Sequence, residues 1–476
     1  SSTTLRGPMQ FDSFTFLLFF VLVLAGAALT RGWGARKNLL LVASYVFYGA
    51  WSPAFTLLLA GASVIDWFLA RRIHAAATQP QRRFWLAASI VLNIGTLALF
   101  KYGPFLHANL ALALAAVGVH IDPWSLGLVL PVGISFYTFQ SVSYTFDVYR
   151  RRVDPIHSLR DFCLFVAFFP QLVAGPIVRF TQFAPQLVEP RAPSWSGLAH
   201  GAVWMVWGLF EKIVLADTVF APVADAAWSN LAGLSSSSAL AASLAFSGQI
   251  FCDFAGYSCC AIGAARCLGF DLPMNFRNPY AAVGFSDFWK RWHISLSTWL
   301  RDYLYIALGG NRGGRWRTYR NLMLTMLLGG LWHGAGWNFV VWGGCHGVLL
   351  VLERLARGER EGANTEPSGL SRLVWAGATL LAVVALWIPF RSPDFASTAL
   401  FLQAFTLSWT PLDFSAACAL TAFAAIVLVQ WLLRDRSLDA LVARAPMPVL
   451  AAALATLLVL IVLSPGDTHA FIYFQF

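Results

Sequence analysis

The sequence predicts an all-α, polytopic integral membrane protein, and three observations lead to this fold class. Hydrophobic residues make up 58% of the 476 residues and charged residues only 12%, whereas soluble domains carry about 45–50% and about 25%. Long apolar runs lack the alternation of apolar and polar residues that barrel strands show. Twenty Trp and 39 Phe fit a membrane protein, because aromatic rings collect at membrane–water interfaces. A soluble globule, a disordered chain and a transmembrane barrel are therefore excluded.

Apolar runs follow one another along the chain. A spanning helix needs about 20 mainly apolar residues, and nine runs are candidates: 11–29, 53–70, 84–100, 126–146, 201–220, 238–262, 373–388, 414–433 and 448–463. The shorter or interrupted runs 39–51 and 162–177 are expected to form half-helices or re-entrant pieces. The run 322–352 has a glycine-rich middle and suffices for about two passes. Roughly ten to twelve membrane segments are therefore expected.

The positive charge of the chain lies between these runs. The net charge of +10 comes largely from short clusters at Arg31–Lys37, Arg71–Arg83 and Arg150–Arg152. Lys and Arg in short loops are typical of the cytoplasmic side of a membrane protein. We therefore interpret the charge as a topology signal and exclude nucleic acid as a partner. With these loops in the cytoplasm, Met9 faces the periplasm or the exterior.

Residues 1–8 are expected to be an appended tail, because they precede Met9 and end in Arg-Gly-Pro. Residues 9–476 then form a single transmembrane domain. No internal repeat is evident, which weakens assignment as a secondary transporter, since such folds often show repeat symmetry. No metal site is expected, because no histidine is grouped with Asp or Glu at ligand spacing and the cysteines form no C-x-x-C pair.

Residues 277–320 are too charged to span a membrane. From Phe285 to Tyr303 apolar residues recur every three or four positions, which predicts one amphipathic helix with His293 on the border of its aromatic face. Two interpretations remain open: an interfacial helix with its Trp residues at headgroup depth, or a basic, Trp-walled vestibule for an anionic cytosolic ligand. In the second, charge for phosphate or carboxylate groups comes from Arg301, Arg312, Arg315, Arg317 and Arg320.

His333 lies well inside apolar sequence, and an ionisable side chain at membrane depth is a functional candidate by default. The glycines around it permit either close helix approach or a gap in which a ligand meets the imidazole; they are Gly329, Gly330, Gly334 and Gly336. A hydrogen-bonded core histidine is the alternative. For His346 a packing role is favoured. Since the chain has no nucleophile elbow, Walker loop or dinucleotide fingerprint, His333 suggests a general base acting on a substrate hydroxyl.

Two motifs carry a resemblance to a known family. The run FSDFWKRWHISLSTWLRDYLYIALGGNR (Phe285–Arg312) and the run GGLWHGAGWNFVVWGGCHG (Gly329–Gly347) resemble the membrane-bound O-acyltransferase (MBOAT) superfamily, and more narrowly the branch of the alginate O-acetyltransferase membrane subunit. FFPQLVAGPIVRF, LPVGISFYTFQSVSYTFDVYR and the end FIYFQF add to this likeness, which covers nearly all of residues 9–476. The superfamily's two functional histidines match His293 in W-H-x-S and His333 in W-H-G. The resemblance implies that His333 is the catalytic one.

The resemblance implies the MBOAT fold, with about eleven transmembrane helices and shorter re-entrant or interfacial helices around a central tunnel. It also implies an acyltransferase of the bacterial inner membrane that moves acetyl from cytosolic acetyl-CoA, or a similar thioester, for O-acetylation of an alginate-like or cellulose-like exopolysaccharide. The thioester is a donor substrate, and no bound cofactor is expected. His293 would orient the thioester, Trp332 and Trp337 would wall the reaction chamber, and the donor would bind Arg301, Arg312 and Arg315.

The partners implied are the lipid bilayer, the thioester donor, a periplasmic serine-hydrolase-like acetyltransferase and the polysaccharide synthesis machinery. Two alternatives stay open. One is transfer of another acyl group, such as D-alanine, from a carrier protein. The other is a non-enzymatic flippase or proton-coupled transporter that uses the same histidines as relay groups. The amphipathic segment 285–308 with its W-H-x-S motif favours the enzyme, because a transporter has no evident use for it.

Overall fold

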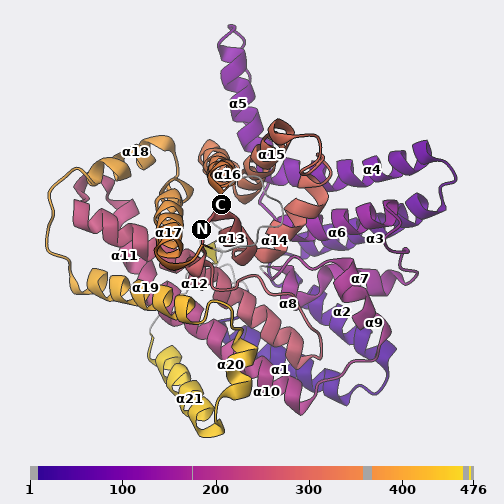
Figure 1. Cartoon of the computed structure of the whole chain (residues 1–476). Coiled ribbons are helices and arrows are strands. Elements are labelled where there is room, and N and C mark those ends of the chain that lie inside the picture. Colours follow the sequence, from indigo (N-terminus) through magenta and orange to yellow (C-terminus); the bar gives the residue numbers. More distant parts are fainter. Residues whose placement is uncertain (1–8, 174, 358–366, 465–470, 473–476) are drawn as a thin grey trace. The chain divides into compact units, whose positions relative to one another are not determined.

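The computed structural model describes residues 9–173, 175–357, 367–464 and 471–472, and throughout these residues the regular structure is helical (Figure 1). The predicted tail, residues 1–8, lies outside them. The chain divides into two compact units, Ser1–Met205 with Cys260–Pro273, and Val206–Cys259 with Met274–Phe476. Two of the three boundaries fall inside the helices α10 and α12, and the third follows α12. Each unit is described by itself below.

The first unit is built on helices whose starts are capped by side chains. Ser13, Ser52, Thr78 and Ser158 each accept a backbone N–H at a helix start, as N-cap residues do. The helices are α1 (Phe14–Leu29), α2 (Trp33–Gly49), α3 (Pro53–Ala75), α4 (Gln79–Leu97), α5 (Gly103–Ala115), α6 (Ile134–Tyr149), α7 (Leu159–Ala167), α8 (Phe169–Leu172), α9 (Phe180–Val188) and α10 (Trp195–Leu209).

Helices α3, α4 and α6 of the first unit pack on one another around a buried carboxylate (Figure 1). Asp66 Oδ1 accepts hydrogen bonds from Ser89 Oγ at 3.0 Å and from Asn93 Nδ2 at 2.8 Å. Ser89 Oγ also lies 3.0 Å from Thr145 Oγ1. Polar side chains that hydrogen-bond across helices hold membrane bundles together where apolar lipid supplies no hydrophobic drive.

The second unit contains the remaining helices and a buried core rich in aromatic rings, among them Trp292, Trp342, Trp387 and Phe390. Its helices are η2 (Phe210–Phe220), α11 (Ala221–Ser229), α12 (Ser236–Cys267, shared with the first unit), α13 (Phe285–Arg291), α14 (Ile294–Trp299), η5 (Leu300–Tyr305), α15 (Arg315–His333), α16 (Trp337–Arg357), α17 (Gly369–Arg391), α18 (Phe395–Ala404), α19 (Phe414–Leu432), α20 (Leu438–Arg444) and α21 (Met447–Leu463).

Glycines bring α15 and α16 into backbone contact, and the two helices run side by side (Figure 1). A Cβ at Gly330 would lie 2.2 Å from Phe339 O, and one at Gly343 would lie 2.2 Å from Met326 O. Such positions exclude any larger residue, which is the use of small residues at membrane helix interfaces. Part of the glycine cluster around His333 therefore serves close helix approach.

Six helical stretches in the described residues are long and apolar enough to cross a membrane: Pro53–Ala75, Gln79–Ala115, Ser236–Cys267, Trp337–Arg357, Gly369–Arg391 and Phe414–Leu432. Three shorter apolar helices are Phe14–Leu29, Phe395–Ala404 and Met447–Leu463. The fold class is confirmed as an all-helical, multi-pass membrane protein. The predicted number of about eleven spans and the central tunnel stay predictions.

One of the predicted apolar runs is broken in the structure. The run 126–146 is not one helix: residues 119–131 are non-helical and α6 begins at Ile134. Pro131 lacks the N–H that a helix needs, and Gly133 has φ 73° with its Cα so close to Leu172 O that a Cβ would lie 2.5 Å away. Residues 39–49 of the run 39–51 lie in α2, and its prediction as a half-helix or re-entrant piece stays a prediction. The run 162–177 is interrupted as predicted, by α7 and α8.

Candidate active site

The chain turns sharply at His293, between α13 and α14. Trp292 has an extended backbone, with φ −98° and ψ 129°, and His293 is left-handed, with φ 43° and ψ 54°. The single amphipathic helix predicted from Phe285 to Tyr303 is therefore wrong. Because the chain changes direction at this turn, the position predicted for His293 on the border of a continuous helix does not apply. The residue is 0% exposed, inside the second unit instead of on a helix border.

The turn brings the two motif histidines together. The centroid of the His293 ring lies 6.5 Å from that of His333, and Trp332 lies beside both, at 5.8 Å from His293 and 5.0 Å from His333. Phe254 meets His293 edge-to-face at 4.7 Å. On its other side, His333 contacts the ring of Trp342 at 5.1 Å. Both imidazoles are thus enclosed by aromatic rings and lie close to each other.

A cavity of about 420 Å³ opens beside His333. Its wall combines aromatic, hydroxyl and cationic side chains, among them Trp289, Lys290, Ser297, Arg301, His333 and Trp342. Gly329, one turn before His333 on α15, also lines it, and a Cβ there would lie 3.1 Å from Leu300 Cδ1. A cavity of this size with a few convergent polar groups is the usual form of a small-molecule site. Gly329 therefore leaves space for a ligand, as one of the two sequence interpretations required.

The structure brings some predicted cations to this cavity and leaves others away from it. Arg301 lines it and is held by Asp302, with Nε 2.7 Å from Oδ1. Arg312 and Arg315 do not line it. The sequence analysis missed Lys290, which stands beside Trp289 on the wall. The two of these cationic side chains that line the cavity therefore come from different helices, Lys290 from α13 and Arg301 from η5.

Neither tryptophan predicted to wall the reaction chamber lines this cavity. Trp332 is buried beside both histidines, whereas Trp337 is 53% exposed at the start of α16. Trp289 and Trp342, which the sequence analysis did not single out, do line it. His346 packs against both, with ring centroids at 5.1 Å and 4.8 Å, which agrees with the packing role favoured for it.

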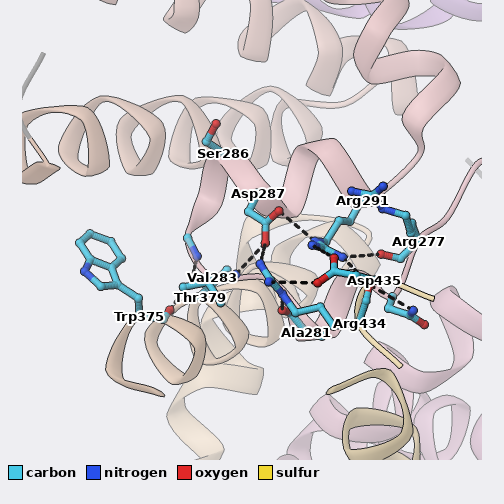
Figure 2. Close-up of polar contacts among 12 residues, drawn as sticks. Arg277, Ala281, Val283, Ser286, Asp287, Arg291, Trp375, Thr379, Arg434 and Asp435 are labelled. Carbon is cyan, nitrogen blue, oxygen red and sulfur yellow. Dashed lines mark hydrogen bonds and ion pairs between the residues drawn. The ribbon is translucent and has the colours of Figure 1, made fainter. Parts of the chain in front are cut away.

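An ion-pair network holds the end of α13 immediately before the turn (Figure 2). Asp287 lies between two guanidinium groups, 2.9 Å from Arg291 Nε and 2.8 Å from Arg434 Nη2. Arg291 also reaches Asp435 at 2.9 Å. Burial by itself would raise the pKa of Asp287, but the backbone N–H of Val283 and the two arginines outweigh burial and hold that pKa below its usual range. The carboxylate is therefore ionised at neutral pH, and the network is charged.

A second charged group lies in the apolar helices behind Phe254. Lys212 Nζ lies 2.9 Å from Asp217 Oδ1 and 2.7 Å from Asp253 Oδ1, and Asp253 Oδ2 accepts the backbone N–H of Ile472 at 2.7 Å. The sequence analysis missed these residues, although charges inside the runs 201–220 and 238–262 were a usable signal. Buried charges persist when they are paired, and Asp253 directly precedes Phe254, whose ring contacts His293.

The two histidines differ in what their surroundings allow. His293 lies outside the candidate spans, and burial lowers its pKa to about 3, so its imidazole is neutral at physiological pH. A neutral imidazole donates one hydrogen bond and accepts another. His333 lines the cavity directly, where it can reach the proton of a bound hydroxyl. The arrangement suits base catalysis by one ring and hydrogen bonding by the other.

Comparison with known proteins agrees with this chemistry. The profile of the "MBOAT, membrane-bound O-acyltransferase family" matches residues 40–385, which include both histidines. A Pseudomonas aeruginosa protein named "Probable alginate O-acetylase" is 43% identical over 81% of this chain and 72% of its own. A peptidoglycan O-acetyltransferase of Helicobacter pylori is 38% identical over 76% and 72%. A teichoic acid D-alanyltransferase of Streptococcus thermophilus is 30% identical over 53% and 64%. The chain therefore belongs to the membrane-bound O-acyltransferase family.

Proposed function

We propose that this O-acyltransferase moves an acetyl group from cytosolic acetyl-CoA, or a similar thioester, across the bacterial inner membrane for O-acetylation of an alginate-like or cellulose-like exopolysaccharide. The observation that carries the proposal is the cavity in which His333 shares a wall with Lys290 and Arg301, with the His293 ring 6.5 Å from that of His333. Two relatives are named for O-acetylation of a polysaccharide, alginate in one and peptidoglycan in the other.

His333 acts as the general base. It takes the proton of the acceptor hydroxyl as the oxygen attacks the thioester carbonyl carbon, and a tetrahedral oxyanion forms. The carbon–sulfur bond then breaks, the acyl group stays on the acceptor oxygen, and the departing thiolate takes the proton back from the His333 imidazolium. A positioned base contributes about 10²–10⁴-fold to such a reaction.

His293 orients the thioester or donates a hydrogen bond to the developing oxyanion. Its burial keeps the ring neutral, which suits a donor that does not titrate during turnover. Trp332 packs against both imidazoles and limits their rotation. Trp289 and Trp342 line the cavity, and the chain of the donor that joins its thioester to its phosphates lies along them.

The phosphates of coenzyme A bind to the cationic end of the site. Lys290 and Arg301 line the cavity, and the predicted residues Arg312 and Arg315 extend this charge along the segment that follows η5. Arginine forks match phosphate oxygens in bidentate pairs, and lysine acts as a point charge. The donor carries its own acyl group, so the protein needs no bound cofactor for the transfer.

The acceptor approaches from the periplasmic side of the tunnel that the family resemblance implies. It is either a sugar hydroxyl or a serine of a periplasmic serine-hydrolase-like acetyltransferase that passes the acetyl group to the polysaccharide synthesis machinery. The lipid bilayer surrounds the bundle, in keeping with the six candidate spans.

A second candidate function is transfer of D-alanine from a carrier protein, which the teichoic acid D-alanyltransferase relative supports over about half of this chain. Acetyl transfer is favoured because the acetylating relatives match over more of the chain and at higher identity. A flippase that uses the histidines as relays has no need for a cavity with cationic side chains beside His333.

The test uses the full chain in proteoliposomes with radiolabelled acetyl-CoA on one side and an acceptor polysaccharide on the other. Label should appear on the acceptor with the wild-type protein and with the control His74→Ala, which removes an exposed histidine, and not with His333→Ala. Transfer from a D-alanyl carrier protein but not from acetyl-CoA would select the second candidate. Label on the acceptor with His333→Ala would overturn the mechanism.

A further inference from the structure

The backbone of His293 adopts a conformation that few side chains tolerate. Among the described residues, only Arg151, Asn278 and His293 have a positive φ without being glycine. A left-handed non-glycine residue is uncommon and persists where its surroundings hold it. The local sequence favours the opposite outcome, because the apolar residues from Phe285 to Tyr303 follow the period of one continuous helix. Something outside this segment must therefore hold the turn.

Two backbone hydrogen bonds bracket the turn. The N–H of Ile294 donates to Asn275 O at 2.8 Å, and the N–H of Arg277 donates to Arg291 O at 3.0 Å. Residues 275–277 thus run alongside residues 291–294, one hydrogen bond on each side of His293. The pairing uses up backbone groups that a continuous helix would need for its own ladder.

The side chain of Asn275 ties this bracket to α12. Ser295 Oγ donates to Asn275 Oδ1 at 2.6 Å, and Asn275 Nδ2 donates to Ser258 Oγ on α12 at 3.1 Å. All three side chains are buried. Ser295 is the serine of the W-H-x-S motif, so the motif pairs the imidazole with the hydroxyl that anchors its turn. In a buried site each such bond is costly to break, because its partner is left unsatisfied.

We propose that Asn275 is a positioning residue for His293. Its amide joins α12 to Ser295 and so keeps the turn left-handed, with the imidazole against Phe254 and its centroid 6.5 Å from that of His333. Without the amide, the segment relaxes toward the continuous helix that its own pattern favours, and the His293 ring turns away from His333. This inference rests on the proposed function, in which His293 orients the thioester or its oxyanion.

The chemistry of the site offers two variants of similar size with opposite expected results. Asn275→Leu removes both of these hydrogen bonds, the one from Ser295 and the one to Ser258. Asn275→Asp keeps both, because each hydroxyl can donate to a carboxylate oxygen. Ser295→Ala removes one bond and leaves the other. Ser243→Ala is the matched control on α12, since its hydroxyl donates to Ala239 O one turn back in the same helix.

The experiment measures kcat and donor KM of acetyl transfer for the full-length protein, after size-exclusion chromatography in detergent and thermal unfolding. For Asn275→Leu we expect kcat to fall roughly tenfold, as the loss of buried hydrogen bonds implies, with donor KM within about twofold of wild type because the cations are untouched. Ser295→Ala should lose less, Asn275→Asp should recover most of the activity, and Ser243→Ala should match the wild type.

A double-mutant cycle shows whether Asn275 acts through His293. In a His293→Ala background, which removes the group that the turn positions, Asn275→Leu should cost little further activity. Losses that multiply would overturn the inference, as would an Asn275→Asp variant no better than Asn275→Leu. If Asn275→Leu does not fold, Ser295→Ala in the same cycle decides. Activity in His333→Ala would overturn the proposed function, whereas an inactive His333→Ala with multiplying losses would overturn this inference alone.

Discussion

The imidazole rings of His293 and His333 lie with their centroids 6.5 Å apart, although 40 residues separate them in the chain. The His293 ring is fully buried and does not line the cavity, whereas the His333 ring forms part of the cavity wall. Aromatic side chains contact both: Trp332 lies beside the two rings, Phe254 contacts His293 and Trp342 contacts His333. This relationship turns two motifs into one site and leads to the following predictions.

Replacing His333 should abolish acyl transfer while the protein still folds. Because His333 is the only group assigned to take the hydroxyl proton, His333→Ala and His333→Gln should both lose at least about 10²-fold in kcat. The measurement is acyl transfer after membrane insertion and detergent monodispersity have been confirmed, with His74→Ala as the control. Activity above a tenth of wild type would contradict the role of general base.

His293 should act through hydrogen bonding and not through a proton that it gains. Glutamine keeps a hydrogen-bond donor, so His293→Gln should retain more kcat/KM than His293→Ala, by about 1–2 kcal/mol for one hydrogen bond. Since burial lowers the pKa of His293 to about 3, the ring is already neutral from pH 5 to 8. The pH profile of His293→Gln should therefore keep the wild-type shape in that range. Two outcomes would reverse the assignment of the two histidines. One is the loss of a limb of the pH–rate profile in His293→Gln. The other is a His293→Gln variant as inactive as His293→Ala while His333→Gln stays active.

The cationic side chains should control donor binding more than turnover. Arg312→Gln with Arg315→Gln should raise the donor KM more than it lowers kcat, because a phosphate contact stabilises ground and transition states alike. Lys290→Gln with Arg301→Gln should raise it further, since these two line the cavity. Saturation curves with acetyl-CoA and with a short acetyl thioester that lacks phosphates separate the effects. An unchanged KM in both double variants would place the donor elsewhere.

A side chain at position 329 should reduce the space beside His333. A Cβ at Gly329 would lie 3.1 Å from Leu300 Cδ1, so Gly329→Ala should be tolerated with a small shift, whereas Gly329→Val should lower kcat/KM by at least tenfold, about 1.4 kcal/mol. Gly344→Ala is the matched control, because its Cβ would meet Leu327 Cδ2 at a similar 3.2 Å away from the cavity. Donors with longer acyl groups should be lost first. Equal activity of Gly329→Val and wild type would show that the acyl group lies elsewhere.

The network around Asp287 should stabilise the protein in a pH-dependent way. The pKa of Asp287 is depressed in the folded protein, so its contribution is present above the unfolded pKa of about 3.9 and is lost as the pH falls through the lower folded value. Asp287→Asn should lower Tm at pH 7. The free energy of unfolding should fall by about 1–3 kcal/mol, as expected when hydrogen bonds to charged groups are lost. The difference from wild type should shrink toward pH 3. A constant difference from pH 7 to pH 3 would mean that the charge of Asp287 contributes nothing.

The sequence by itself determined the class of the protein, most of its membrane segments and the two motif histidines. These properties are local: a run of apolar residues excludes water along its own length, and an ionisable side chain inside such a run is costly wherever the rest of the chain lies. The sequence also allows Lys212 and Asp253 to be recognised as candidates, because they are charged residues inside apolar runs. The catalytic roles of the histidines rested on the family resemblance.

Only the tertiary structure decided the geometry of the site. The helical period from Phe285 to Tyr303 predicted one straight helix, yet backbone hydrogen bonds to residues 275–277 and ion pairs to Arg434 and Asp435, more than 140 residues away along the chain, break it at His293. Lys290, Trp289 and Trp342 line the cavity, whereas the predicted residues Trp332, Trp337, Arg312 and Arg315 do not. A periodic pattern records what a segment prefers alone, and buried partners distant in sequence outweigh that preference when their own hydrogen bonds would otherwise go unmet.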